Sequence, residues 1–138
     1  MGRTRLDSES PEVAKHLRGA TPQEIRTFIW QACDRAVTAG GLEDPLALQA
    51  LSAMRTTALD VELASSLESL AERIDQEYFD AQERSGSSWV TLFHRARAAA
   101  ALSLGVLVTD ADLAAECVYE TAHALDDPPA AYAAMLSL

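Results

Sequence analysis

The 138-residue chain has few of the residues that mark catalytic, metal-binding or disulfide-bonded proteins. It contains two cysteines, three histidines and six glycines. The cysteines form no CxxC pair, the glycines form no phosphate-binding loop, and no GxSxG sequence marks a serine nucleophile. The sequence therefore specifies no reaction, and we expect a non-enzymatic protein with no catalytic residue and no cofactor.

Long apolar runs are also missing. No run approaches the roughly 18 apolar residues that a membrane span needs, and the first ten residues lack the apolar core of a secretory signal. We therefore expect a soluble, cytoplasmic protein without a membrane partner. In that compartment Cys33 and Cys117, which fall within apolar helical stripes, are expected to be reduced core residues.

Basic residues are outnumbered almost two to one. Eleven Lys and Arg face 21 Asp and Glu, which gives a net charge of −10. An anionic surface repels phosphate backbones, so we expect no nucleic-acid partner. The charge either only keeps the protein soluble or attracts a basic protein partner, and the sequence leaves both interpretations open.

Proline and its preceding residues mark where helices begin. Ser10, Thr21, Asp44 and Asp127 each precede a proline, the pattern of a side-chain N-cap followed by proline in the first helical turn. Glu24 adds a capping box to Thr21, and Asp112 is placed to do the same for Thr109. With the apolar spacing, these signals predict helices at residues 11–18, 21–40, 45–59, 61–84, 89–108, 109–125 and 129–136.

The predicted architecture is an all-α, single-domain bundle of six to seven helices. No segment alternates apolar and polar residues as a strand does. Residues 89–108 are apolar around most of the helix, which is typical of a central helix. We expect residues 1–10 to be a flexible tail and residues 11–138 to be one helical domain.

The best metal-binding pattern is Glu120-x-x-His123, which places a carboxylate and an imidazole on one helical face. Di-iron bundles carry this pair on two helices, whereas this chain has one copy. We expect Glu120 and His123 to lie with Glu116 on an outward polar face, and therefore predict no metal site. They remain the candidate ligands if a metal is held.

Two arginines interrupt the apolar helix predicted at 89–108. Arginines on a mostly buried helix need carboxylate partners, so we expect Arg95 and Arg97 to pair with acids from the helices at 61–84 and 109–125. The alternative is that they form an anion-binding pocket.

The helix at 61–84 carries most of its acids on the face opposite its leucines. Such a face is either solvated or docks a basic protein. The partner-binding candidates are Glu68, Glu72 and Asp75 on this helix, Glu116 on the helix at 109–125, and Trp30, which lies off the main stripe of its own helix.

Three segments, with an acid-rich helix between the first two, carry a family resemblance. They are residues 46–55 (LALQALSAMR), 93–102 (FHRARAAAAL) and 114–125 (AAECVYETAHAL). Over residues 21–138 the pattern resembles small all-α immunity proteins of bacterial polymorphic toxin systems. The resemblance implies an inhibitor that covers a toxin, often a basic enzyme, and it assigns no individual binding residue.

Two other classes of function stay open. A homo-oligomeric adaptor or structural protein would use apolar contacts, for which Trp30, Tyr132 and Met135 are the candidates. An enzyme that binds a small ligand or a metal would be built on Arg95, Arg97, Glu120 and His123.

Overall fold

Side-chain caps define where most helices begin in the computed structural model, which describes residues 4–56, 59–84 and 89–137. Within these ranges the chain is all-α, without strands, and forms a single domain. The helices are α1 (Arg5–Glu9), α2 (Pro11–Arg18), α3 (Pro22–Gly40), α4 (Pro45–Ala53), α5 (Val61–Glu83), α6 (Trp89–Gly105), α7 (Ala111–His123) and α8 (Pro128–Met135).

The four cap-and-proline signals are confirmed. The side chains of Ser10, Thr21, Asp44 and Asp127 each accept a hydrogen bond from a backbone N–H in the first turn of α2, α3, α4 and α8. The backbone N–H of Thr21 in turn donates to Glu24 Oε1 at 2.8 Å, which completes the predicted capping box. At the other end of α3, Gly41 takes the left-handed conformation with φ of 67°, which favours glycine.

Three predicted boundaries are wrong. The cap of α7 is Asp110, whose Oδ1 accepts from the Leu113 N–H at 2.8 Å, so Thr109 and Asp112 do not form a capping box. Helix α6 ends at Gly105 instead of residue 108, because the chain turns there toward α7. Helix α4 ends at Ala53 instead of residue 59, and residues 57–58 lie outside the described ranges.

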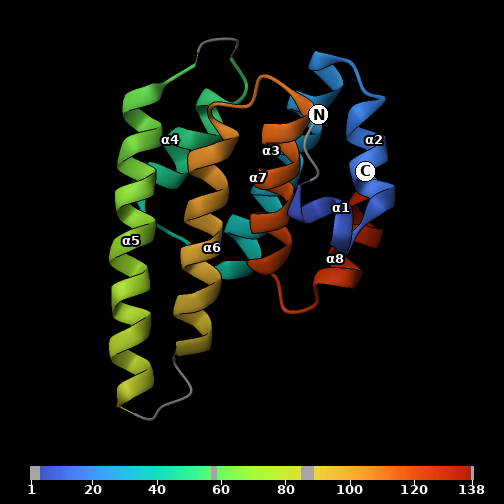
Figure 1. Cartoon of the computed structure of the whole chain (residues 1–138). Helices are drawn as coiled ribbons and strands as arrows, with labels where there is room; N and C mark the ends of the chain where they lie inside the picture. Colours follow the sequence, from blue (N-terminus) through green and yellow to red (C-terminus); the bar gives the residue numbers. More distant parts are fainter. Residues whose placement is uncertain (1–3, 57–58, 85–88, 138) are drawn as a thin grey trace.

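Helix α6 is central, as predicted. It packs against α5 on one side, α7 on another, and α3 and α4 on a third (Figure 1). Ala98, Ala99 and Ala101 are fully buried, and their small side chains let these neighbours approach closely. Helix α7 is a second centre, because it contacts α1, α2, α3, α6 and α8.

The α5–α6 hairpin extends beyond the other helices at its lower end (Figure 1). Tyr78 of α5 packs on Trp89 and Phe93 of α6, with ring centroids 5.8 and 5.6 Å apart. Phe79 remains 55% exposed beside them. Residues 85–88, the expected loop between these helices, lie outside the described ranges.

The core holds both cysteines, as predicted. Cys33 of α3 and Cys117 of α7 are fully buried free thiols with their Sγ atoms 3.6 Å apart. The neighbouring Cys33 and burial away from water raise the pKa of Cys117 well above its ordinary value. The space is tight here, since a Cβ added to Gly105 would lie 2.7 Å from Met54 Cε and 3.2 Å from Cys33 Sγ.

The described part of the expected N-terminal tail is not a tail. Residues Arg5–Glu9 form α1, which packs on α7 and α2, and Leu6 is fully buried. Arg18 of α2 holds Asp7 through two hydrogen bonds of 2.6 and 2.8 Å. The mixed charges that suggested a solvated segment instead pair with the body of the domain.

None of the described helices has both the length and the apolar character needed to span a bilayer.

Replacing the α7 cap tests the corrected boundary. Asp110→Ala should lower the free energy of unfolding by about 1 kcal/mol, because the Leu113 N–H loses its partner. The matched Thr109→Ala variant should change it by only a few tenths of a kcal/mol. Chemical denaturation of the two variants measures the difference, and equal losses would contradict the assignment of Asp110.

Candidate functional site

Arg97 of α6 links the two helices that flank it. Its Nη1 donates to Glu120 Oε2 of α7 at 2.9 Å, and its Nη2 donates to Asp75 of α5 at 3.0 and 3.2 Å. The predicted pairing of Arg97 with acids from both neighbouring helices is therefore confirmed. Because the guanidinium is a planar fork, a single residue can hold α5, α6 and α7 together.

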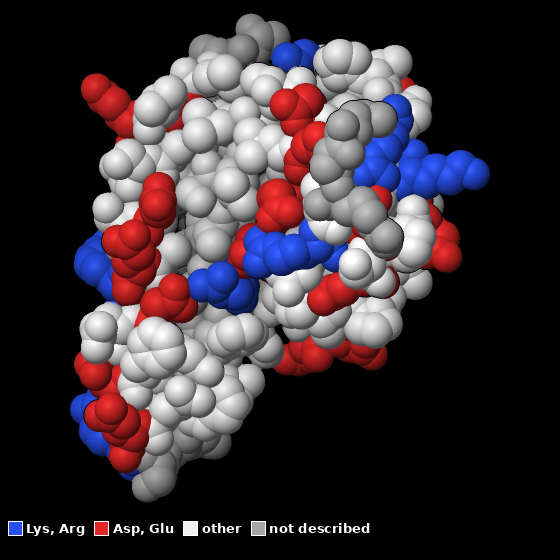
Figure 2. All heavy atoms as spheres, in the orientation of Figure 1, with Lys and Arg blue, Asp and Glu red and all other residues white. Residues whose placement is uncertain are grey.

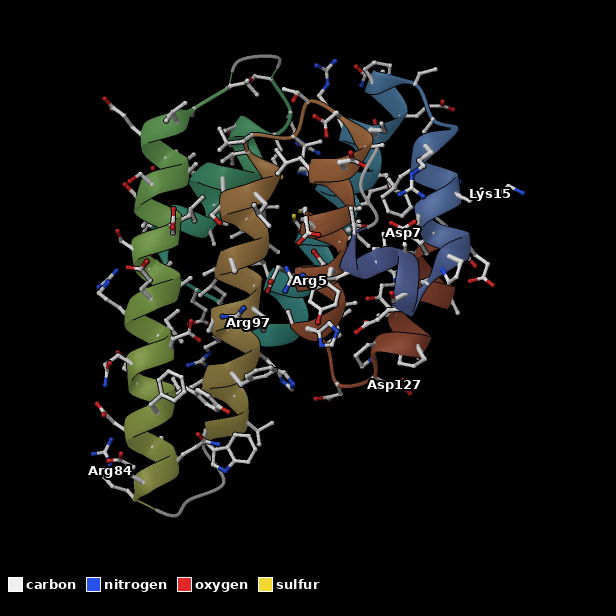
Figure 3. The ribbon with its side chains drawn as sticks, viewed as in Figure 1. Arg5, Asp7, Lys15, Arg84, Arg97 and Asp127 are labelled. Carbon is white, nitrogen blue, oxygen red and sulfur yellow. The ribbon has the colours of Figure 1, made fainter. Side chains whose placement is uncertain are left out.

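Arg5 extends this pairing to the N-terminal helix. Its Nη2 lies 2.7 Å from Glu116 and 3.2 Å from Glu120, and its guanidinium stacks 4.1 Å from the Tyr119 ring centroid. Although partial burial opposes the shift, Glu116 and then Glu120 raise the pKa of Arg5 above its ordinary value. We call Asp75, Arg97, Glu120, Arg5 and Glu116 the charge network. Figure 3 shows Arg5 and Arg97 converging on α7 from α1 and α6.

Glu120 is buried, which corrects the prediction that it faces outward. Its side chain is only 8% exposed. Position 120 follows Leu113 by seven residues and Cys117 by three, and both spacings keep a residue on the same helical face. Arg97 and Arg5 supply the two charges that make a carboxylate acceptable at this site.

His123 does not join Glu120 in a metal site. Its Nε2 lies 2.9 Å from both carboxylate oxygens of Glu9, whereas Glu120 is held by the two arginines. Across residues 4–56, 59–84 and 89–137, no group of three or more His, Cys, Asp or Glu residues is arranged to hold a metal ion.

Glu9 Oε1 also accepts a hydrogen bond from the Tyr132 hydroxyl, at 2.7 Å. Tyr132 and Met135 are 4% and 1% exposed, so they pack inside their own chain. They are therefore not available as contacts between copies, which corrects their selection for a homo-oligomeric role. α8 is a docking element of the domain itself, joined to α1 through Tyr132 and Glu9.

Arg95 and Arg97 do not form one anion pocket. They are two residues apart, so their side chains leave α6 in nearly opposite directions. Arg95 Nε donates to the Gly40 carbonyl of α3 at 3.4 Å, while Arg97 is already paired with two carboxylates. No carboxylate within ion-pair distance of Arg95 is found in the described residues, so the pairing predicted for it is wrong.

The acidic candidates fall into two groups. Asp75 and Glu116 belong to the charge network. Glu68 and Glu72 are exposed on α5, and among the described residues neither has an ion-pair partner. Figure 2 shows acidic side chains along the edge of the molecule formed by α5.

Trp30 lies apart from these acids, on α3. The Arg55 guanidinium lies 4.4 Å from its ring centroid, and the ring is partly buried against the core. A cation from beyond the end of α4 therefore lies against part of the ring, and the rest of the ring stays partly exposed. The structure does not bring Trp30 together with Glu68, Glu72 or Glu116.

A groove along α6, between α5 and α7, was missed by the sequence analysis. We call it the α6 groove. Its volume is about 370 Å³, and it is lined by Val61, Ala64, Ser65 and Glu68 of α5, Ala100, Ser103, Leu104 and Leu107 at the end of α6, and Glu120 of α7. In Figure 2 it is a hollowed white band with acidic side chains on either side. In the sequence, the groove was indicated only by the spacing of residues 97, 100, 104 and 107, which is the spacing of residues on one face of a helix.

Comparison with protein-family models, with curated proteins and with solved structures gives no significant match. The functional interpretation therefore depends on the residues and their geometry.

Removing Arg97 should destabilise the domain. Arg97→Met leaves Glu120 buried with one arginine, so we expect a loss on the order of 2 kcal/mol. Arg95→Met, the same substitution two residues away, should cost about 1 kcal/mol or less, because Arg95 makes one long hydrogen bond. Urea denaturation compares them, and equal losses would refute a special role for the charge network.

Acid should release the N-terminal helix. Hydrogen bonds from Arg18 and Thr4 lower the pKa of Asp7, and those from Tyr132 and His123 lower the pKa of Glu9 despite partial burial. A carboxyl group whose pKa is lowered in the folded state stabilises the fold at pH values above its pKa in the unfolded state, which is 3.8 for Asp7 and 4.5 for Glu9. This stabilisation is lost as the pH falls below those values.

Hydrogen exchange of the α1 amides should therefore accelerate, relative to the α6 amides, from about pH 5 to pH 3. In Asp7→Asn the acceleration should be smaller, because one titrating group is gone. The same acceleration in both proteins would contradict the contribution of Asp7.

Proposed function

We propose that this protein is a non-enzymatic binding module that recognises a basic protein through the exposed acidic face of α5. Its role on this proposal is inhibition, in the manner of an immunity protein that covers a basic toxin or enzyme. The inhibitory role rests on the sequence resemblance, and the acidic binding face rests on the geometry of α5.

The pair Glu68 and Glu72 is the observation that carries the proposal. The two carboxylates are exposed and one helical turn apart, and no ion pair involving either is found in the part of the chain described above. Like charges spaced four residues apart destabilise a helix by about 0.2–0.5 kcal/mol. A cation from a partner would relieve this repulsion.

The neighbouring acids have a different role. Asp75 lies one turn from Glu72 but is held by Arg97, and Glu116 is held by Arg5. Their charges are largely neutralised within the chain. Among the four acidic candidates, the exposed charge available to a partner therefore comes from Glu68 and Glu72, so these two residues provide the sharper test.

A single substitution separates binding from solubility. Glu72→Lys places a lysine four residues after Glu68, the favourable orientation for a helical ion pair, so it should raise the free energy of unfolding by several tenths of a kcal/mol. If the acidic face binds a basic protein, the same variant should bind that protein more weakly. If the face is only solubilising, stability should rise without any loss of binding.

The binding measurement uses immobilised protein and extract of the source organism, at low and at high salt. Wild type should capture a basic protein that high salt releases, and the Glu68→Lys/Glu72→Lys variant should capture at least about tenfold less of it. The control variant Glu12→Lys/Glu43→Lys has the same net charge but changes exposed acids of α2 and of the segment before α4. Equal capture by the two variants would refute the α5 face.

A further inference from the structure

We propose that the α6 groove binds an amphipathic helix with a basic polar face, supplied by a partner protein. This inference rests on the proposed function and gives the partner a chemical form. It adds an apolar contact to the acidic surface, and that contact can be tested separately from the charge.

The floor of the groove suits the apolar stripe of a helix. Ala100, Ser103, Leu104 and Leu107 are all only partly buried, although α6 is covered on its other sides by α5, α7, α3 and α4. Ala100, Ser103 and Leu104 lie in the last two turns of α6, and Leu107 lies in the turn that follows its end at Gly105. Ala100, Ser103 and Ala64 are small, so a leucine of the partner can reach the floor between them.

The walls of the groove select a basic partner. Glu68 stands on the α5 wall, and Glu120 closes the α7 side. Glu72, one turn further along α5, is exposed beyond it. The nearby cation Arg97 is already balanced by Asp75 and Glu120. A Lys or Arg on the α5 side of the docking helix would therefore meet the exposed carboxylates of Glu68 and Glu72, whereas Glu120 on the α7 side is already paired with Arg97 and Arg5.

The backbone around the groove favours a helix over an extended segment. The lining residues of α5 and α7, and most of those of α6, lie within helices, where the backbone groups bond to one another. The described residues around the groove therefore offer no sheet edge to which an extended segment could add. A segment that docks there must satisfy its own N–H and C=O groups, and a helix does so.

Two synthetic peptides of roughly 18 residues test the inference by isothermal titration calorimetry. The first has Leu at positions i, i+3, i+4 and i+7 and Lys on its other face. The second has the same composition in an order that scatters the leucines. The amphipathic peptide should bind with 1:1 stoichiometry and about tenfold or more tighter than the scattered one.

Variants of the groove separate its apolar contact from the charge. Leu104→Gln/Leu107→Gln should remove the preference for the amphipathic peptide, whereas the control Leu48→Gln/Leu59→Gln, at residues 69% and 53% exposed elsewhere, should keep it. Because the groove leucines also contact the core, Ser65→Trp provides a second test. Position 65 is exposed, so the indole fills the mouth of the groove without removing a core contact.

Each outcome decides the question. Loss of the preference in both groove variants supports the inference. Equal binding of the two peptides, abolished by Glu68→Lys/Glu72→Lys, overturns the groove while the acidic-face proposal stands. Absence of binding by either peptide also overturns the groove, and the capture experiment then judges the proposed function independently.

Discussion

The arrangement of this domain depends on one arginine placed between two buried or half-buried carboxylates. Arg97 connects α5 to α7 across α6, and α7 in turn contacts five other helices. Glu120 is acceptable in its buried position because Arg97 and Arg5 both reach it. A buried charge costs free energy when it is alone, so Glu120 requires the arginines, whereas Arg5 is 53% exposed and does not depend on its partners in the same way.

The same chemistry explains why α1 is part of the domain. Leu6 supplies apolar burial, but a five-residue helix is far too short to be stable by itself. Its polar residues complete the attachment: Arg5 reaches α7, Asp7 reaches α2, and Glu9 reaches His123 and Tyr132. The N-terminal segment thus joins α2, α7 and α8 through side chains of opposite charge and one phenol.

Helix starts were predictable from sequence because capping is local. Ser10, Thr21, Asp44 and Asp127 bond to atoms within three residues of themselves, so no knowledge of tertiary structure is needed. Asp110 was missed because two adjacent capping residues compete, and the choice depends on backbone angles. The pairing of Arg97 was predictable because a buried guanidinium needs carboxylates. The partners of Glu9 and Arg5 lie more than 100 positions away along the chain and could not be read from spacing. The α6 groove was also hidden, since it depends on α5 and α7 standing apart.

The one-sided attachment of α5 has a mechanical consequence. Apart from its contacts with α4, this 23-residue helix is held mainly by α6, and the aromatic rings of Tyr78, Trp89 and Phe93 close its projecting end. Most of its tertiary contacts therefore belong to one interface, the one with α6. A partner segment bound against both α5 and α7 would give α5 a second interface. Binding in the α6 groove would then restrain the motion of the whole α5–α6 hairpin.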